Sequence, residues 1–323
     1  MKRKRAQKRF ILYIMINREL IRTKIVQLGY AYYHNECPTP DKAEKELLLS
    51  LSKAYELYNY LLGLIVAITQ EERHRVEVVT NRAKREGKVV PSARFANNKF
   101  ALQLEENLQL SQFLSQYGLT WDNDIDVVRK LCDMMEATKV YNDYMASDDD
   151  SYEAHRAVWK TLYRQVILDN ADLDAALEEK SIYWNDDKAV IDTFVMKTIK
   201  RFEPENGEEQ PLLPDYDNDD DRAFACQLMK CTLENAEEYQ AYMSNASRNW
   251  DFSRLAAMDV VIMQTAIAEM INIPNIPVNV TINEYVELAK NYSTPKSASY
   301  INGMLDAIGR DLKASGKMLK PMK

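Results

Sequence analysis

The side chains best suited to binding chemistry lie near the end of the chain, where Thr294 and Pro295 predict the start of a helix. Proline at the first helical position gives up no backbone hydrogen bond, and the free N–H groups of a helix start carry a partial positive charge. Lys296 and Ser297 follow at once and could hold a phosphate oxygen there. Tyr300 comes one turn later, where its ring could stack on an unpaired base, although the helical periodicity also fits a position in the core.

A second set of candidates is basic and lies near the start of the chain. Residues 1–24 contain nine Lys or Arg and one Glu, whereas the other 299 residues contain 33 basic and 48 acidic side chains. Arg18 and Arg22 are four residues apart in a segment with helical periodicity, so we expect them on one accessible rim of that helix. A basic end on a chain with a net charge of −7 indicates a phosphate-bearing partner, and a solubilising tail is the alternative.

Catalytic and metal-binding patterns are missing from the sequence. It has no GxSxG, GxxxxGK[ST], GxGxxG or HExxH motif, its four cysteines form no CxxC pair, and its three histidines are scattered. The aspartate runs at 148–150 and 219–221 lie in polar surroundings that would not raise a carboxyl pKa for acid–base work. We therefore expect a protein that is not an enzyme, binds no cofactor or metal, and stays in the cytoplasm with reduced thiols.

No stretch of the sequence is long enough to span a membrane. The apolar run at 10–16 follows basic residues, as in a signal peptide, but it is short and lacks a small-residue cleavage site. The run at 60–69 is about half the length that a membrane-spanning helix needs, and it indicates a buried helix. Met15 directly precedes the first regular helical pattern and is an alternative start of translation to Met1.

The elements that carry these residues are predicted to be helices. Eight glycines in 323 residues leave little material for hairpin turns, and apolar residues recur with a helical period. The first helix covers residues 18–34 with Asn17 as its N-cap, and a longer one runs from Asp41 to Thr69 or beyond. Softer patterns predict helices at 95–117, 125–145, 152–167 and 186–202.

The last hundred residues contain the clearest helix boundaries. Helices are predicted at 222–243 and at 253–271, where Ser253 is the expected N-cap and the nearly continuous apolar composition indicates a central position. Thr281 and Glu284 fit a capping box, which predicts a helix start at 281. The final helix should point four apolar residues inward, namely Ile301, Leu305, Ile308 and Leu312.

Charge and proline content divide the chain into three predicted parts. These are an N-terminal helical subdomain with a basic arm (1–75), an acidic helical insertion with a linker (76–221), and a C-terminal helical bundle (222–323). Residues 203–221 contain three prolines and nine acidic residues without any Lys or Arg, which is the composition of a solvated linker.

The stretch NEYVELAK at 283–290 is followed by Ser297 and by YINGMLD at 300–306. This combination closely resembles the C-terminal signature of the NusB family of transcription antitermination factors. Segments 254–259 and 268–270 resemble the preceding family helix, although Gln264 stands where the family often has arginine. Residues 18–33 resemble the arginine-rich first helix, with Gln27 and Tyr30 at matching positions.

The resemblance implies a NusB-like, all-α fold of two helical bundles, here with a helical insertion, and a function without enzymatic activity. It implies binding to the boxA element of ribosomal RNA together with the ribosomal protein NusE, in the RNA polymerase elongation complex. The matching positions are the expected contacts with single-stranded RNA, namely Arg18, Arg22, Tyr30, Lys296, Ser297 and Tyr300. Asp259 matches a position that faces the NusE partner.

Two other functions stay open. One is a helical protein-interaction scaffold without RNA binding. The other is an RNA methyltransferase, because related helical modules are appended to such enzymes, but no glycine-rich cofactor loop and no cysteine in a PC-type motif follow. Residues 76–221 have no counterpart in short family members, and we expect the family-like core to stand when residues 92–220 are removed.

Overall fold

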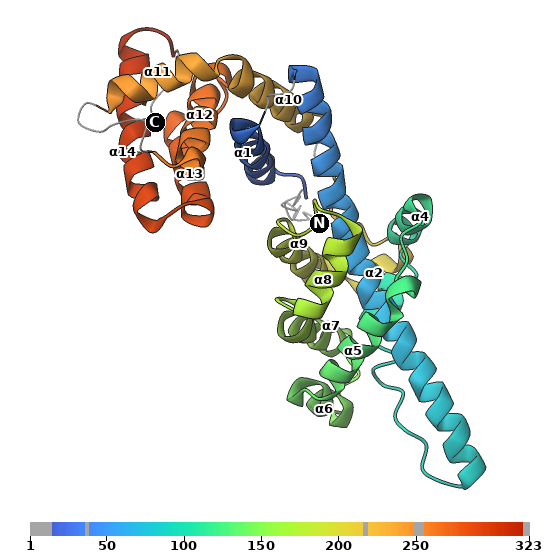
Figure 1. The fold of residues 1–323 in the computed structure, drawn as a ribbon. Coiled ribbons are helices and arrows are strands. Elements are labelled where there is room, and N and C mark those ends of the chain that lie inside the picture. The colour runs from blue at the N-terminus through green and yellow to red at the C-terminus, as the bar shows by residue number, and fades with distance from the viewer. Residues whose placement is uncertain (1–14, 36–38, 216–218, 248–254, 319–323) are drawn as a thin grey trace, which may run out of the picture. The chain divides into compact units, whose positions relative to one another are not determined.

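The computed structural model describes residues 15–35, 39–215, 219–247 and 255–318, and every regular element in these ranges is helical (Figure 1). The α-helices are α1 (Arg18–His34), α2 (Pro40–Glu86), α3 (Lys99–Glu105), α4 (Leu108–Tyr117), α5 (Ile125–Glu136), α6 (Lys139–Ala146), α7 (Tyr152–Leu162), α8 (Ala171–Lys180), α9 (Lys188–Arg201), α10 (Asp219–Glu234), α11 (Ala236–Ala246), α12 (Ala257–Asn272), α13 (Val278–Tyr292) and α14 (Pro295–Ala314). Short helical turns are η1 (Asp122–Asp124), η2 (Tyr163–Ile167) and η3 (Pro204–Glu209).

The all-α fold class predicted from the sequence is confirmed. In the part of the chain that the structure describes, no helix has both the length and the apolar composition needed to cross a membrane. The basic arm before Met15 and the predicted cap Ser253 lie outside the described residues.

The chain forms two compact units, which differ from the three predicted parts. The main part of unit 1 is Lys53–Pro214, and unit 2 consists of Ile16–Ser52 together with Asp215–Lys323. The predicted boundary at 75 falls inside α2, whose first thirteen residues belong to unit 2 and whose remainder belongs to unit 1. Unit 2 is therefore made from two segments that are far apart in the sequence.

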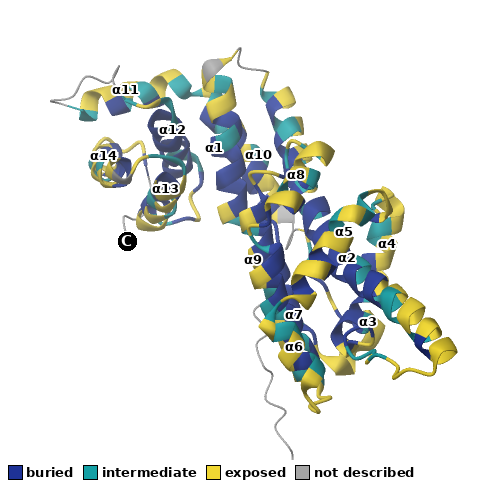
Figure 2. Ribbon diagram, turned by 60° about the horizontal axis from the view of Figure 1, so that its bottom comes forward, coloured by how far each residue is buried: buried dark blue, intermediate teal, exposed yellow. Residues whose placement is uncertain are grey.

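Helix α12 forms the centre of unit 2. It contacts α1, α10, α11, α13 and α14, and every residue from Asp259 to Met270 is buried (Figure 2). The sequence predicted this central position from the apolar composition of the helix, and the prediction is confirmed. Helix α14 turns its four predicted apolar residues inward, since Ile301, Leu305, Ile308 and Leu312 are all buried.

Two helix starts are found where the sequence predicts them. The side chain of Asn17 accepts a hydrogen bond from the backbone N–H of Leu20 and caps α1. The side chain of Thr294 accepts from the backbone N–H of Ser297 and caps α14, with Pro295 at the first helical position. Both caps are contacts between residues three positions apart, so the local sequence is sufficient to predict these helix starts.

The capping box predicted at Thr281 is wrong. Helix α13 begins at Val278, so Thr281 already lies in its first turn. The Thr281 hydroxyl donates to the carboxylate of Glu269 on α12 instead of capping its own helix. Here a tertiary partner replaces the local one.

Unit 1 is built on the C-terminal part of α2, whose Tyr60 stacks on Trp121 with ring centroids 4.1 Å apart. The segments predicted as single helices at 95–117 and 125–145 are each two helices. The breaks occur where Asn107 caps α4 and Thr138 caps α6. Helices at 152–167 and 186–202 are found close to their predicted ranges, whereas α8 was not predicted.

Residues 210–213 are not the solvated linker that their composition indicated. Gln210, Leu212 and Leu213 are buried in unit 1. The backbone N–H of Leu213 donates to the Tyr58 hydroxyl at 3.1 Å, and the Asn107 amide donates to the Gln210 carbonyl at 2.8 Å. The two adjacent leucines in this otherwise acidic stretch are the feature of the sequence that could have predicted its burial.

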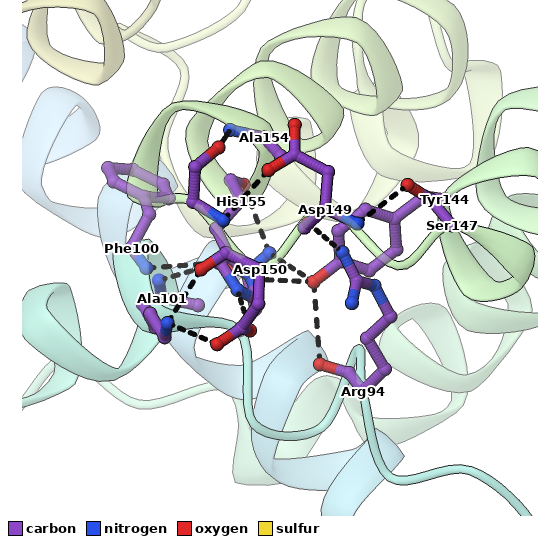
Figure 3. A network of polar contacts seen from close by, with 12 residues as sticks. Arg94, Phe100, Ala101, Tyr144, Ser147, Asp149, Asp150, Ala154 and His155 are labelled. Carbon is purple, nitrogen blue, oxygen red and sulfur yellow. Dashed lines mark hydrogen bonds and ion pairs between the residues drawn. The ribbon is translucent and has the colours of Figure 1, made fainter.

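A polar network fixes two loops of unit 1 (Figure 3). The buried His155 has Nδ1 2.6 Å from the Tyr144 hydroxyl and Nε2 2.9 Å from the Asp150 carboxylate. Asn98 caps α3 and also donates to the backbone carbonyl of His155 at 3.0 Å. Burial lowers the pKa of His155, while hydrogen bonds from Lys99 and His155 lower the pKa of Asp150 to about 2. The network therefore ties the loop before α7 to the start of α3.

Candidate functional site

Arg22 lies in the interior of unit 2 and not on the accessible rim that the sequence predicted. Its side chain is 4% exposed. The guanidinium donates to both carboxylate oxygens of Glu269 on α12, at 2.8 and 3.1 Å, and to Glu284 on α13 at 3.1 Å. This correction gives Arg22 a structural role, because three helices meet at its side chain.

The Glu269 carboxylate that receives Arg22 is completely buried and fully hydrogen-bonded. The Thr281 hydroxyl donates to it at 2.8 Å and the Tyr285 hydroxyl at 3.1 Å. Burial, and then the charge of Glu269, raise the pKa of Tyr285 well above its usual value. Burial alone would lower the pKa of Arg22, but the hydrogen bond and charge of Glu269 outweigh it, so the pKa of Arg22 is raised. The arginine therefore stays charged in the interior.

Arg18 lies on the same helix but is 40% exposed in its side chain. Its Nε donates to Asp221 at 3.0 Å, and its guanidinium carbon lies 5.1 Å from the centre of the Phe224 ring. A cavity of about 190 Å³ opens beside it and is lined by Phe224 and by residues 273–275, which follow the end of α12. Arg18 therefore has an accessible cationic side chain, as predicted, at the C-terminal end of α12.

Asp259 and Ser297 are bonded to each other, although the sequence assigned one to a protein partner and the other to RNA. The Ser297 hydroxyl donates to one oxygen of Asp259 at 2.8 Å, and the Ser293 hydroxyl donates to the other at 2.5 Å. Asp259 is 6% exposed and Ser297 is 7% exposed. The structure thus corrects the expectation that these two side chains face outward, because their polar atoms fasten the start of α14 to the start of α12.

Helices α1 and α12 run antiparallel to each other. Arg22 meets Glu269 near the end of α12, and a Cβ atom added to Gly29 would lie 3.0 Å from Val261 Cγ1 near its start. The missing side chain of glycine therefore lets the two helices approach closely here without displacing Val261. The residue after Gly29, Tyr30, therefore lies at the end of unit 2 where α12 begins.

Three of the predicted contacts share this end of unit 2. Tyr30 is 38% exposed, and Lys296 is exposed in the first turn of α14. Tyr300 is half-buried, and burial followed by the charge of Asp259 raises the pKa of its hydroxyl. Arg18 lies at the opposite end of α12, which is about 24 Å long. Tyr30, Lys296 and Tyr300 therefore lie at one end of unit 2, Tyr30 on α1 and the other two on α14, and Arg18 lies at the opposite end.

The sequence analysis did not predict Glu269 as the partner of Arg22. A carboxylate whose neighbours along an apolar helix are apolar is a buried charge, and a buried charge requires a cation and hydrogen-bond donors. That rule points to an arginine elsewhere in the chain, and Arg22 fills the role. Tyr33, three residues after Tyr30 and 45% exposed, is a further aromatic side chain that was not predicted.

Comparison with known proteins shows to which family this chain is related. The transcription antitermination protein NusB of Salinibacter ruber is 33% identical over 132 residues, which are 39% of this chain and 82% of that protein. The chain belongs to the NusB family. The NusB family model matches residues 193–310, from within α9 to within α14.

Other members of the NusB family align in the same way. The transcription antitermination protein NusB of Acetivibrio thermocellus is 40% identical over 118 residues, covering 35% of this chain and 81% of that protein. The protein of the same name from Geobacter sulfurreducens is 40% identical over 95 residues, covering 29% and 69%. Each alignment covers most of the relative but at most 39% of this chain, so the chain is a family member with a large additional segment.

Proposed function

We propose that this chain is a transcription antitermination factor that binds boxA-like single-stranded RNA through the end of unit 2 where α12 begins. The support is of two kinds. Its relatives are named transcription antitermination proteins, and this end of the unit combines aromatic and cationic side chains. The proposal extends to the ribosomal protein NusE as joint partner and to the RNA polymerase elongation complex as the place of action, without enzymatic activity.

The observation that carries the proposal is the accessible start of α14 at the same end of unit 2 as an exposed aromatic residue. The N-terminus of a twenty-residue helix has a partial positive charge, and Lys296 adds a full one. Tyr30 offers a ring face on which an unpaired base can stack. Ser297 and Asp259 contribute indirectly, since they hold the helix start in position. Arg18 is proposed as a phosphate contact further along the same RNA.

A titration of the full chain with labelled boxA-like RNA, with and without NusE, tests this function. We expect Lys296→Gln to weaken binding, whereas Lys313→Gln at the other end of α14 should leave it unchanged. The two lysines are both exposed and lie about 25 Å apart on one helix, so each variant removes one charge from the same element.

The aromatic contact is tested in the same titration. Tyr30→Ala should cost about 1–3 kcal/mol of binding free energy, while Tyr30→Phe should be close to neutral, because stacking needs the ring and not the hydroxyl. Equal RNA affinities for all of these variants and the original chain would contradict the proposal. The burial of Arg22 and Ser297 would then favour the alternative, a helical scaffold that binds proteins without RNA.

A further inference from the structure

The last turns of α2 and the residues that follow form a basic tip on unit 1, which we define as residues 78–90. This segment contains Arg82, Lys84, Arg85 and Lys88, with Glu86 as its single acidic residue. The rest of Lys53–Pro214 has 16 basic and 28 acidic residues. The tip is thus a concentrated positive charge on a unit that is otherwise strongly negative.

The cations of the tip are accessible. All four basic residues are exposed, and the side chains of Arg82 and Lys88 are 78% and 71% exposed. Both of these contact Glu86, at 2.9 and 2.7 Å, so one carboxylate is shared by two cations. No ion pair joins Lys84 or Arg85 to a residue in the described ranges of unit 1. A net positive charge therefore remains on the tip after its own ion pairs are formed.

The tip also extends beyond the other helices of its unit. In Figure 1 the last turns of α2 continue past the helices that pack on its middle part, and Figure 2 shows the same segment as mostly exposed. The helix ends at Glu86, where Gly87 adopts φ of 66° and the backbone N–H of Lys88 bonds to the Ala83 carbonyl. Acidic residues of α3–α9 are therefore kept away from a ligand that approaches the tip.

The positive charge of the tip indicates a negatively charged partner. Four long cationic side chains within seven residues complement the negative charge of the phosphates along a nucleic-acid backbone. Valine side chains are exposed there too, at 78, 79, 89 and 90, but they carry no charge and are too small to stack on bases. The tip is thus built for sequence-independent contact with phosphates.

We propose that the basic tip of α2 is a second RNA-binding surface, separate from the one on unit 2, that binds the phosphate backbone of single-stranded RNA. The ligand class rests on the proposed function, but the surface belongs to a unit that lies largely outside the family match at 193–310. It adds affinity without sequence preference.

The test uses the full chain and a fluorescein-labelled single-stranded RNA of about 40 nucleotides, titrated at several salt concentrations. The tip variant Lys84→Gln, Arg85→Gln, Lys88→Gln is compared with the control Lys139→Gln, Arg164→Gln, Lys200→Gln, which removes three exposed cations from elsewhere in unit 1. We expect the tip variant to reduce the slope of log affinity against log salt by about 2 and to weaken binding by up to about 100-fold at about 0.1 M salt. The control should stay close to the original chain.

Two further variants separate charge from shape. Lys84→Arg, Arg85→Lys, Lys88→Arg keeps the charge and should restore the original slope, whereas Val78→Ser with Val89→Ser should leave RNA binding unchanged. The proposal is overturned if the tip variant binds RNA like the control. It is equally overturned if the valine variant and not the charge variant loses affinity for RNA, since the contact with RNA would then be apolar and not ionic.

The same titration distinguishes this proposal from the proposed function. If the unit 2 site fails, Lys296→Gln has no effect while the tip variant still lowers the salt slope. If the tip fails, Lys296→Gln weakens binding while the tip variant does not. A chain that binds no RNA at all would overturn both.

Discussion

Arg22 and Glu269 meet inside unit 2 through two parallel hydrogen bonds of 2.8 and 3.1 Å, although 247 positions separate them in the sequence. The pair joins the first helix of the unit to its central one, and Glu284 adds a third helix. The intact pair contributes little to the free energy of unfolding. Removing one partner costs much more, because the remaining charge is left buried without a counter-ion.

Arg22→Ala should lower the free energy of unfolding by about 3–5 kcal/mol, because it leaves the Glu269 carboxylate buried without its cation. The double variant Arg22→Met, Glu269→Leu should recover much of that loss, since no unpaired charge remains. Urea denaturation followed by circular dichroism measures both. An Arg22→Ala chain with unchanged stability and weakened RNA binding would contradict the interior position of this side chain.

Ser297→Ala should destabilise the chain by about 1–3 kcal/mol, because a buried oxygen of Asp259 loses its donor. Ser299→Ala, two residues further along α14 and exposed, is the matched control and should change little. Combining Ser297→Ala with Asp259→Ala in a double-mutant cycle should give a coupling energy of about 0.5–3 kcal/mol. Additive effects of the two substitutions would argue against their hydrogen bond.

Glu72 should make the stability of unit 1 depend on pH. Burial, followed by the hydrogen bond and charge of Glu136, raises the pKa of Glu72 from 4.5 to about 7, while the hydrogen bond from Tyr141 and the charge of Arg75 oppose this rise. The folded state then binds more protons than the unfolded state between these values, so this contribution to stability is complete below pH 4.5 and is lost as the pH rises through 7.

The variant Glu72→Gln should remove this dependence, and its advantage in unfolding free energy over the original chain should grow from pH 5 to pH 8. Glu77→Gln, on the exposed side of the same helix, serves as the control. Denaturation curves at four pH values decide the matter. Parallel pH profiles for the original chain and Glu72→Gln would show that Glu72 titrates as an ordinary surface carboxylate.

Removing residues 92–214 and joining the ends by a flexible linker should abolish cooperative unfolding. The sequence led to the opposite expectation for a similar deletion. In unit 1 these residues cover the face of α2 that includes the buried Leu61, Leu64 and Ile65, and Trp121 donates to the Tyr60 carbonyl at 3.0 Å. Calorimetry and light scattering on the shortened chain measure the outcome, and a sharp, reversible transition would refute the prediction.

The features that the sequence predicted correctly depend on local chemistry. Asn17 caps α1 and Thr294 caps α14 through contacts within three residues. The central position of α12 follows from its composition alone. The family resemblance is strongest over residues 254–306, where the segments that carry it are nearly continuous, and it also includes residues 18–33.

The features that the sequence did not predict depend on partners that are remote in the chain. Arg18 and Arg22 are equivalent by helical periodicity, but α1 is covered by both α10 and α12, so its buried face is wider than its apolar stripe. Only the position of Glu269 distinguishes the two arginines. Thr281 likewise matches a cap pattern and is used by that same carboxylate.

The discontinuous make-up of unit 2 has a consequence for synthesis on the ribosome. Helix α1 is synthesised before α12, its docking surface, and more than two hundred residues separate the two, which is a delay of about 10–45 s at about 5–20 residues per second. Unit 1 is complete before α12 exists. The face of α1 that packs on α12 is therefore accessible to chaperones and solvent throughout that interval, and α1 is among the last of the described helices to reach its final place.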